Sequence, residues 1–444
     1  MKKIITIASI LIIFTVLALV VLNHQSGGDT LYLLNWGEYI NQDLVKDFEN
    51  KFNCSVVEET VTSSETMYQK IVSSTTSYDV AIPGDYMVTK LKDEGYLKKI
   101  DLNNSKYESF YNKDNLFVDS LEALRNKYGF TNEYSLPYFW GAYSMIYNTK
   151  YSDTESVIKE NGFKALFDRS LFNENVQIGM YSTARWTVAA YLMANGIDPN
   201  NEDFDQIKLV KDIKAAKFDV WGDDQLKRQT ATGNLDLCFV QLGDFFDALY
   251  LSLEEGLDVN NSLATGLDAL PFNVNVPSTT SAFFDAMVIP TTSKNYNLAN
   301  EFINFMLTPE NAYENALAIG YCPTLNSVVD LYDKDALNGE LYFEDGDNPN
   351  RNITLDSFLK KYPVYLNPLQ NADINKVTMF EAKDSSYMTL CETLVNQAKS
   401  NVSTGSSLGK TLCIAVVSVA SVSLVSYIGY KYIKNYKKKK KLLQ

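Results

Sequence analysis

Histidine is almost absent from this chain of 444 residues, which contains only His24. Metal sites and nucleophilic triads that depend on histidine are therefore effectively excluded. The sequence also lacks a nucleophile elbow and any recognisable metal-ligand spacing, so scattered carboxylates are the groups left to carry chemistry. We expect no catalytic residue, no metal and no cofactor, and we do not expect an enzyme.

Cysteine is also scarce. The five residues are Cys54, Cys238, Cys322, Cys391 and Cys413, an odd number without a C-x-x-C pair. Two of the first four could form a disulfide in an external domain, but their spacing selects no pair. Buried free thiols are the alternative.

Positive charge is concentrated at the two ends of the chain. The formal net charge is −14, yet residues 1–24 and 401–444 hold ten Lys and no acidic residue, so the middle carries −24. An acidic middle argues against nucleic-acid binding and is compatible with a cationic ligand. The same charge would also serve solubility.

Long apolar runs are likewise confined to the ends. Residues 4–22 are uncharged, mostly apolar and long enough to span a bilayer, with Lys2 and Lys3 before them and no cleavage site after them. We expect an uncleaved anchor here, with a cleaved signal sequence as the alternative. A flexible linker at 401–410 leads to a second span at 411–430 and a basic tail at 431–444. Lysines outside both spans predict cytoplasmic termini, contact with membrane lipid and an extracellular middle region.

One stretch near the start of the middle region carries distinctive chemistry. Residues 31–34 are apolar or β-favouring and run into Asn35-Trp36-Gly37-Glu38-Tyr39. This pattern predicts a strand that brings an acid between two aromatic residues to the carboxyl edge of a sheet, where open α/β folds bind ligands. Such a cluster suits an organic cation. A buried Trp and Tyr beside a solvated Glu is the alternative.

Strands and helices then alternate with short links. Asn41 is expected to cap a helix over 44–52, and helices are expected from Ser63 and from Asp85, with strands at 55–61 and 78–82. A second region has strands at 176–180 and 237–241 and a helix over 187–193. This alternation predicts an α/β fold with a parallel, doubly wound sheet in each region.

Two extended segments, 135–148 and 282–290, connect these regions. Two crossings between two lobes predict a clamshell that closes on a ligand by hinge bending. We expect lobe 1 to begin with residues 30–141 and lobe 2 to comprise residues 142–284. Residues 285–400 are expected to return to lobe 1 with closing helices.

The chain at this point resembles the bacterial spermidine/putrescine-binding proteins, the extracellular receptors of polyamine ABC importers. The resemblance covers roughly residues 31–400 and implies a two-lobed, type II periplasmic-binding-protein fold with a polyamine-like ligand. It is carried by blocks in matching order, namely Asn35 to Tyr39, Ser63 to Tyr68, Tyr78-Asp79 with Ile82-Pro83, Leu136 to Tyr138 with Trp140 to Ala142, Phe283 to Asp285 with Ile289-Pro290, Ile303 to Phe305, and Ile319 to Tyr321 with Pro323-Thr324 and Asn326.

The resemblance also implies which residues contact the ligand. A polyamine alternates methylenes with ammonium groups, so aromatic walls and carboxylates match its chemistry. Asp285 lies on the second crossing, where we expect it to meet the ligand between the lobes; an ion pair with a neighbouring Lys is the alternative. Phe283 stands where the family usually has a Trp. The other positions carried over are Trp36, Glu38, Tyr39, Tyr86 and Tyr321.

The second lobe departs from the family pattern. Thr183 and Trp186 stand where the family commonly has an Asp and a Glu, and Gln241 replaces a family Trp. Asp244 and Asp85 are the candidates to supply the missing charge. If neither faces the cleft, we expect a ligand that is less charged than spermidine.

Together these inferences predict a monomeric, membrane-tethered solute receptor. It would capture spermidine, putrescine or spermine and deliver it to a separate ABC permease and ATPase, with ligand selecting the closed clamshell. One alternative is a receptor for another cationic solute such as thiamine, which the missing second-lobe acids favour. The other is a surface structural or adhesive protein on the same fold.

Overall fold

The computed structural model describes residues 29–101, 116–223, 225–255, 267, 270–346 and 351–400. The predicted anchor, linker, second span and basic tail lie outside these ranges. No helix within them is both long and apolar enough to cross a bilayer. Residues 1–395 cluster as one compact unit and residues 396–444 as another, of which only 396–400 are described.

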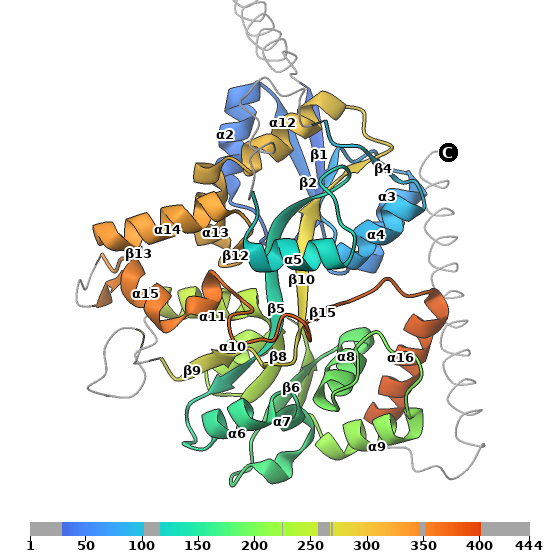
Figure 1. Ribbon diagram of the computed structural model, residues 1–444, viewed down its shortest axis with the longest axis vertical. Helices are drawn as coiled ribbons and strands as arrows, with labels where there is room; N and C mark the ends of the chain where they lie inside the picture. Colours follow the sequence, from blue (N-terminus) through green and yellow to red (C-terminus); the bar gives the residue numbers. More distant parts are fainter. Residues whose placement is uncertain are drawn as a thin grey trace, which may run out of the picture. The chain divides into compact units, whose positions relative to one another are not determined.

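The first lobe is built on a parallel sheet with the strand order β2-β1-β3 (Figure 1). Its first helix begins after Asn41, whose side chain accepts a hydrogen bond from the backbone of Asp43, so the predicted cap is confirmed. A central strand with a parallel neighbour on each side is the predicted doubly wound arrangement. The elements are β1 Thr30–Trp36, α2 Gln42–Phe52, β2 Ser55–Val61, α3 Ser64–Ser73, β3 Val80–Ala81, α4 Asp85–Asp93, β4 Leu97–Lys98, α5 Asp119–Lys127, β11 Ile289–Pro290, α12 Tyr296–Met306, α13 Pro309–Ile319 and β12 Cys322–Pro323.

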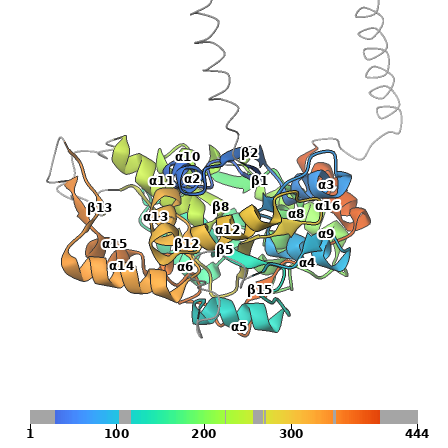
Figure 2. The same cartoon turned by 90° about the horizontal axis from the view of Figure 1, so that it is seen from above.

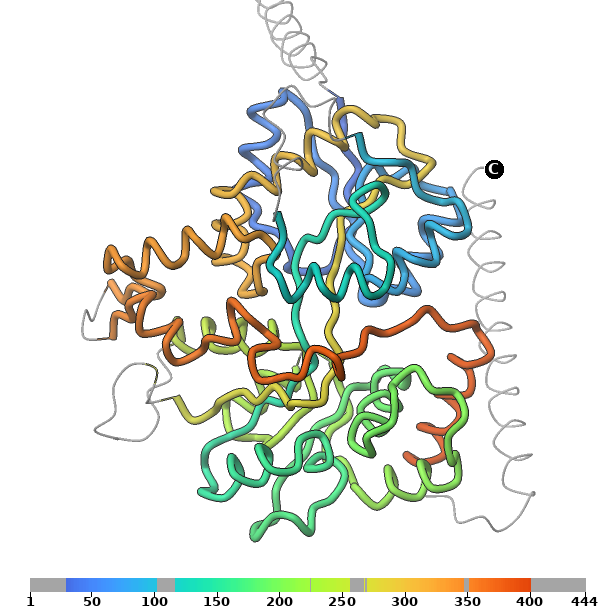
Figure 3. Tube along the Cα trace, in the orientation of Figure 1, coloured from blue at the N-terminus to red at the C-terminus, as the bar shows by residue number. Residues whose placement is uncertain are grey.

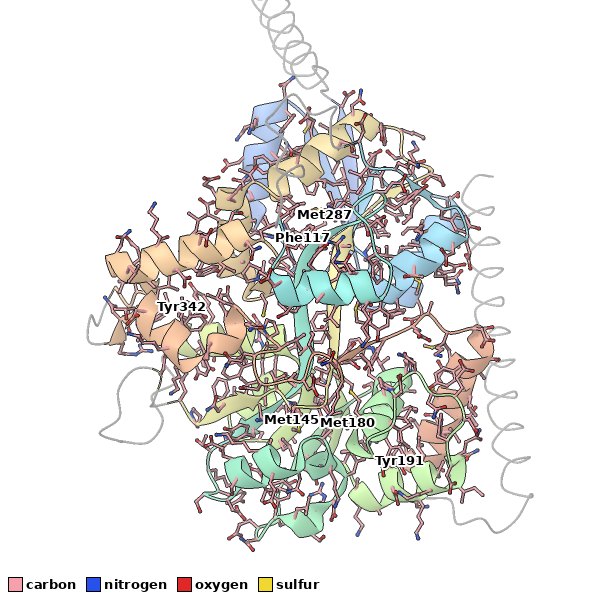
Figure 4. The ribbon with its side chains drawn as sticks, viewed as in Figure 1. Phe117, Met145, Met180, Tyr191, Met287 and Tyr342 are labelled. Atoms are coloured by element: carbon pink, nitrogen blue, oxygen red, sulfur yellow. The ribbon has the colours of Figure 1, made fainter. Side chains whose placement is uncertain are left out.

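The second lobe repeats this order, because β6 lies between β7 and β8 and runs parallel to both. One cluster of buried residues runs through both lobes and includes Met145 and Met180 in the second lobe and Met287 and Phe117 in the first, which Figure 4 labels. The elements are α6 Thr154–Asn161, α7 Lys164–Phe167, η1 Arg169–Leu171, β6 Ile178–Tyr181, α8 Ala184–Ala194, α9 Gln206–Ala216, β7 Val220–Gly222, α10 Gln225–Ala231, β8 Leu237–Gln241, α11 Leu242–Glu254 and β9 Phe272–Asn275.

Two long strands join the lobes, as the tube in Figure 3 shows: β5 (Leu136–Asn148) and β10 (Ser281–Met287). β5 pairs with β10 up to Ala142 and with β8 from Tyr143 onward, so it changes partner between these two residues. Every residue of both strands is buried. These strands therefore connect the two sheets through the protein interior.

The chain after residue 326 contacts both lobes. Phe246 of the second lobe lies 5.8 Å from Phe358 and 4.8 Å from Tyr365, measured between ring centroids. Viewed from above, α14 and α15 lie on one side of the crossing strands and α3 and α4 on the other (Figure 2). Helices α12 and α13 thus return to lobe 1 as predicted. The segment after them also contacts lobe 2. Its elements are α14 Asn326–Asn338, β13 Leu341–Phe343, β14 Ile353–Thr354, α15 Leu355–Lys361, η4 Pro363–Tyr365, β15 Thr378–Met379 and α16 Ser385–Lys399.

β15 makes a third connection between the lobes, beyond the two predicted. Thr378 pairs with Ser281 of β10, and the hydroxyl of Tyr128 in the first lobe accepts a hydrogen bond from the backbone N–H of Met379. The side chain of Asn200 in the second lobe bonds the backbone carbonyl of Met379 (2.8 Å) and the N–H of Glu381 (2.9 Å). A strand of two residues leaves no periodic pattern, which is why the sequence did not reveal it.

The four described cysteines are free thiols. Cys238, Cys322 and Cys391 are buried and Cys54 is half-buried. Of the two alternatives left open by the spacing, free thiols are therefore the one observed among the described residues.

Candidate functional site

The predicted turn after β1 is held in place by Trp36. Its indole Nε1 donates a hydrogen bond of 2.8 Å to the carbonyl of Ile82, at the end of β3. Glu38 is exposed and has a φ of +52°, in the left-handed region that non-glycine residues seldom enter. Such backbone strain persists where surrounding structure imposes it, and it is frequent at ligand-binding sites.

Tyr39 and Asp285 meet at the junction of the lobes. The Tyr39 hydroxyl donates a hydrogen bond of 2.6 Å to Oδ2 of Asp285, and both side chains are buried. Tyr138 fixes the position of Tyr39, because its hydroxyl donates to the Tyr39 carbonyl at 2.9 Å. The ring of Tyr321 lies edge-on to that of Tyr39, with 4.9 Å between centroids. Asp285 is thus bonded to a tyrosine that packs within an aromatic cluster.

Asp85 lies beside Asp285 as a second buried acid. It accepts hydrogen bonds from the backbone N–H groups of Phe284 (3.2 Å) and Tyr86 (2.5 Å). Burial raises the pKa of Asp285 to about 7, and the hydrogen bond from Tyr39 opposes this shift. Burial also raises the pKa of Asp85 well above its ordinary value, to which the charge of Asp285 contributes. A positive group between these acids would favour their ionised forms.

No Lys or Arg among the described residues forms an ion pair with Asp285, so the predicted alternative of a neighbouring Lys partner is wrong for that part of the chain. A buried carboxylate without a cationic partner is costly in its ionised form. It is therefore suited to receive a cation from solution.

An aromatic wall continues from the first lobe into the second. The ring of Tyr143 lies 5.7 Å from that of Phe283 and 5.9 Å from that of Trp186. Phe283 lies opposite Gly141, where a Cβ would come within 2.9 Å of its ring, so the glycine makes room for the aromatic side chain. Tyr181 extends the wall, with 4.8 Å between its ring and that of Trp186.

The second-lobe acid Asp244 already has partners within the protein. Its carboxylate accepts a hydrogen bond from the Tyr181 hydroxyl at 2.6 Å and from the backbone N–H of Gln241 at 3.1 Å. Lys227 Nζ lies 3.7 Å from Oδ1 of Asp244 and 2.7 Å from Asp247. Asp244 is therefore occupied by internal partners, unlike Asp285.

Tyr321 connects this second-lobe group to Tyr39. Its hydroxyl lies 3.4 Å from both Oε1 of Gln241 and Oδ1 of Asp244. Its ring rests on Gly243, where a Cβ would clash with the ring. One tyrosine thus contacts both lobes.

The remaining predicted residues lie around this group. Tyr86 is half-buried, and its hydroxyl donates to Oε1 of Glu65 at 3.3 Å. Thr183 is exposed at the N-terminus of α8, and its side chain makes no capping hydrogen bond. Direct contacts or electrostatic effects through Tyr143 join nine of the predicted residues: Tyr39, Asp85, Tyr86, Phe283, Asp285, Tyr321, Gln241, Asp244 and Trp186.

Sequence reasoning missed two residues of the site, Tyr143 and Tyr181. Tyr143 sits where β5 changes partner. Burial raises its pKa, and the nearby charges of Asp85 and Asp285 add to that rise. The signal for Tyr143 was its position in the first crossing segment, and that for Tyr181 was an aromatic residue at the end of a predicted strand. Neither position was distinguishable from core without the tertiary contacts.

A buried anion with aromatic walls, set between two α/β lobes joined by crossing strands, is the arrangement of a solute-binding protein. The family model described as "Bacterial extracellular solute-binding protein" matches residues 43–340, and the chain belongs to this family.

Relatives with stated ligands are similar over much of the chain. The spermidine/putrescine-binding periplasmic protein of Salmonella typhimurium is 29% identical over 309 residues, which cover 68% of this chain and 79% of the relative. The putrescine-binding periplasmic protein PotF of Escherichia coli is 24% identical over 296 residues, which cover 63% of this chain and 74% of that relative. The structure of the spermidine/putrescine ABC transporter substrate-binding protein PotD from Streptococcus pneumoniae is 25% identical with a TM-score of 0.59, covering 84% of this chain and 99% of that one.

Proposed function

We propose that this protein is an extracellular receptor that captures a polyamine, namely spermidine, putrescine or spermine, for an ABC importer. The observation that carries the proposal is the buried carboxylate of Asp285, bonded to Tyr39, whose ring packs against that of Tyr321. An ammonium group satisfies such a carboxylate, and the adjoining methylenes lie on ring faces. The stated ligands of the similar proteins support the same class of solute. We expect no catalytic activity.

The proposal includes a membrane tether. The apolar runs at 4–22 and 411–430, with lysines on their outer sides, favour two spans with both termini in the cytoplasm. Tethering would hold a monomeric receptor at high local concentration beside the permease and ATPase subunits. To test this arrangement, single cysteines are introduced at the two termini of the protein, and intact cells are treated with a membrane-impermeant thiol reagent. We expect both cysteines to be protected from the reagent, and labelling at either end would contradict the arrangement.

A second candidate function is capture of a less charged cation, such as thiamine. The observation that favours it is that Asp244, the second lobe's candidate acid, shares Lys227 with Asp247 and so offers a ligand less negative charge. Thr183 and Trp186 supply none in its place. The two candidates share Asp285 and differ in how many positive charges the ligand carries.

Calorimetric titration of the full-length protein in lipid nanodiscs tests both candidates. We expect micromolar or tighter binding of at least one of spermine, spermidine and putrescine. Asp285→Asn should weaken binding more than tenfold, about 1.4 kcal/mol. The matched control, Asp330→Asn, removes an exposed acid of α14 and should leave affinity unchanged. Binding of thiamine alone would establish the second candidate, and no binding of any of the four would favour the adhesive alternative.

A further inference from the structure

The first turn of α11 is a surface of lobe 2 on which a segment of lobe 1 rests. Gly320 ends α13 in the left-handed region, with a φ of +78°, and a Cβ there would come within 3.3 Å of the backbone nitrogen of Asp247. The ring of Tyr321, the next residue, lies on Gly243 so closely that a Cβ at that glycine would clash with it. Two glycines, one from each lobe, thus permit a close interlobe contact.

The same helical turn carries two acids that share one lysine. Asp244 and Asp247 are three residues apart in α11, so they lie on one face of the helix. Lys227 of α10 places its Nζ 2.7 Å from Oδ2 of Asp247 and 3.7 Å from Oδ1 of Asp244. The side chain of Lys227 is only 12% exposed and that of Asp244 only 7%. Lys227 therefore offsets the repulsion between two like charges where water screens them little.

Asp244 in turn organises the start of α11 and contacts Tyr321. Its Oδ2 accepts a hydrogen bond of 3.1 Å from the backbone N–H of Gln241, whose own side chain completes a reciprocal cap of the helix. The Tyr321 hydroxyl lies 3.4 Å from both Oδ1 of Asp244 and Oε1 of Gln241. The ring of Tyr321 lies 4.9 Å from that of Tyr39, whose hydroxyl donates to Asp285. A continuous series of contacts thus leads from the first turn of α11 to the carboxylate assigned to the ligand.

We propose that Lys227 is a positioning residue for ligand capture: it holds the two acids of α11 and, through them, the place of Tyr321 against Tyr39. The inference rests on the proposed receptor function and applies to any cation that Asp285 binds. Without Lys227 the two acids lose the lysine that they share, so relief of their repulsion shifts the first turn of α11 and Tyr321 with it.

A lysine that only screened Asp244 would act in the opposite direction. Its removal would add negative charge near the site, and a cationic ligand would then bind more tightly. The sign of the change in affinity therefore distinguishes positioning from screening.

Calorimetric titration of full-length Lys227→Met in lipid nanodiscs with spermidine and putrescine tests the proposal. We expect the affinity for each polyamine that the wild type binds to fall about fivefold to tenfold, and Lys227→Arg, which keeps the charge, to recover most of it. Lys211→Met, at an exposed lysine of α9, is the matched control and should leave affinity unchanged. Lys227→Gln takes the place of Lys227→Met if that variant folds poorly.

A double-mutant cycle tests whether the effect passes through Tyr321. In a Tyr321→Ala background, which lacks both the ring and the hydroxyl, Lys227→Met should cause less than a twofold further loss of affinity. Hydrogen exchange gives a second measurement that needs no ligand. Exchange of the backbone amides of residues 319–322 should be faster in Lys227→Met than in the wild type and unchanged over β7.

Tighter binding by Lys227→Met, or equal losses in the wild-type and Tyr321→Ala backgrounds, would overturn the proposal. If the wild type binds a polyamine through Asp285 and Lys227→Met binds it equally well, the proposed function stands and this inference fails. If the wild type binds no polyamine, the proposed function fails. In that case unchanged exchange over residues 319–322 would overturn the role of Lys227 as well, whereas faster exchange would support its positioning of Tyr321.

Discussion

The hydroxyl of Tyr39 donates a hydrogen bond of 2.6 Å to Asp285, although 246 residues separate the two along the chain. Tyr39 follows the first strand, and Asp285 lies on the second crossing. The contact therefore joins the start of lobe 1 to the interlobe strands. It orients the one buried acid that we assign to ligand capture.

Removing this hydrogen bond should weaken binding. A hydrogen bond to a charged group contributes roughly 1.5–3 kcal/mol, so Tyr39→Phe is expected to weaken polyamine binding at pH 7 at least tenfold. Part of the loss arises because the pKa of Asp285, which the bond lowers, rises without it. Titration at pH 7 and pH 8.5 should show a smaller loss at the higher pH. Tyr191→Phe, which removes a hydroxyl bonded to Asp212, is the control.

Affinity should depend on pH. Because burial raises the pKa of Asp285 to about 7, its ionised form becomes scarce below that pH, and an ammonium ligand requires that form. We expect affinity to fall by up to tenfold per pH unit below 7 and to level off above it. Calorimetry from pH 5.5 to 8.5 measures this dependence. A wild-type affinity that does not change over that range would contradict the assignment.

The ligand-free protein should show the opposite trend in stability. The pKa of Asp285 is higher in the folded protein than its ordinary value near 3.9, so the folded state binds the proton more strongly. Its contribution to stability is thus present at low pH and is lost as pH rises from about 4 to 7, at up to about 1.4 kcal/mol per unit. Asp285→Asn should raise the melting temperature at pH 8 and raise it less at pH 5. An unchanged melting temperature at both values would refute this.

Gly141 should be intolerant of a side chain. A Cβ there would lie 2.9 Å from Cζ of Phe283 in a fully buried strand, and overpacking of this kind costs about 1–3 kcal/mol. Chemical denaturation of Gly141→Ala should show that loss in the free energy of unfolding. Gly37→Ala, where nothing lies within 4 Å of the new Cβ, is the control and should be nearly neutral. Equal stability of the two variants would argue against the close approach.

Asn200 should hold the third connection to lobe 2. Its side chain bonds the backbone of Met379 and Glu381 and also accepts from Arg185 at 3.1 Å. Asn200→Ala leaves these buried groups without a partner, at a cost of about 1–3 kcal/mol. Hydrogen exchange should then speed up over residues 377–392 and remain unchanged over β6. Asn201→Ala, at an exposed neighbour, should have no such effect.

Local patterns in the sequence predicted most of the framework. The cap at Asn41, the strand before Trp36, both long crossings and the two α/β lobes follow from periodicity and turn residues, which act over a few positions. Asp285 was predictable as a site residue because it lies in a recognisable block on a crossing strand.

Interactions between segments far apart in the chain could not be predicted from such local patterns. Whether an acid is free or neutralised depends on what folding brings beside it: Lys227 pairs with Asp244, while Asp285 has Tyr39. The same holds for Tyr143, which belongs to the site because β5 changes partner there.

The sequence by itself determined the class of fold and the aromatic and acidic residues available for a cation, since these depend on composition and short-range order. Only the tertiary structure decided which carboxylates are available and that the segment after β15 lines a cavity with Glu65. The physical reason is that burial and pairing are properties of segments far apart in the chain, and they set the charge that a site presents to its ligand.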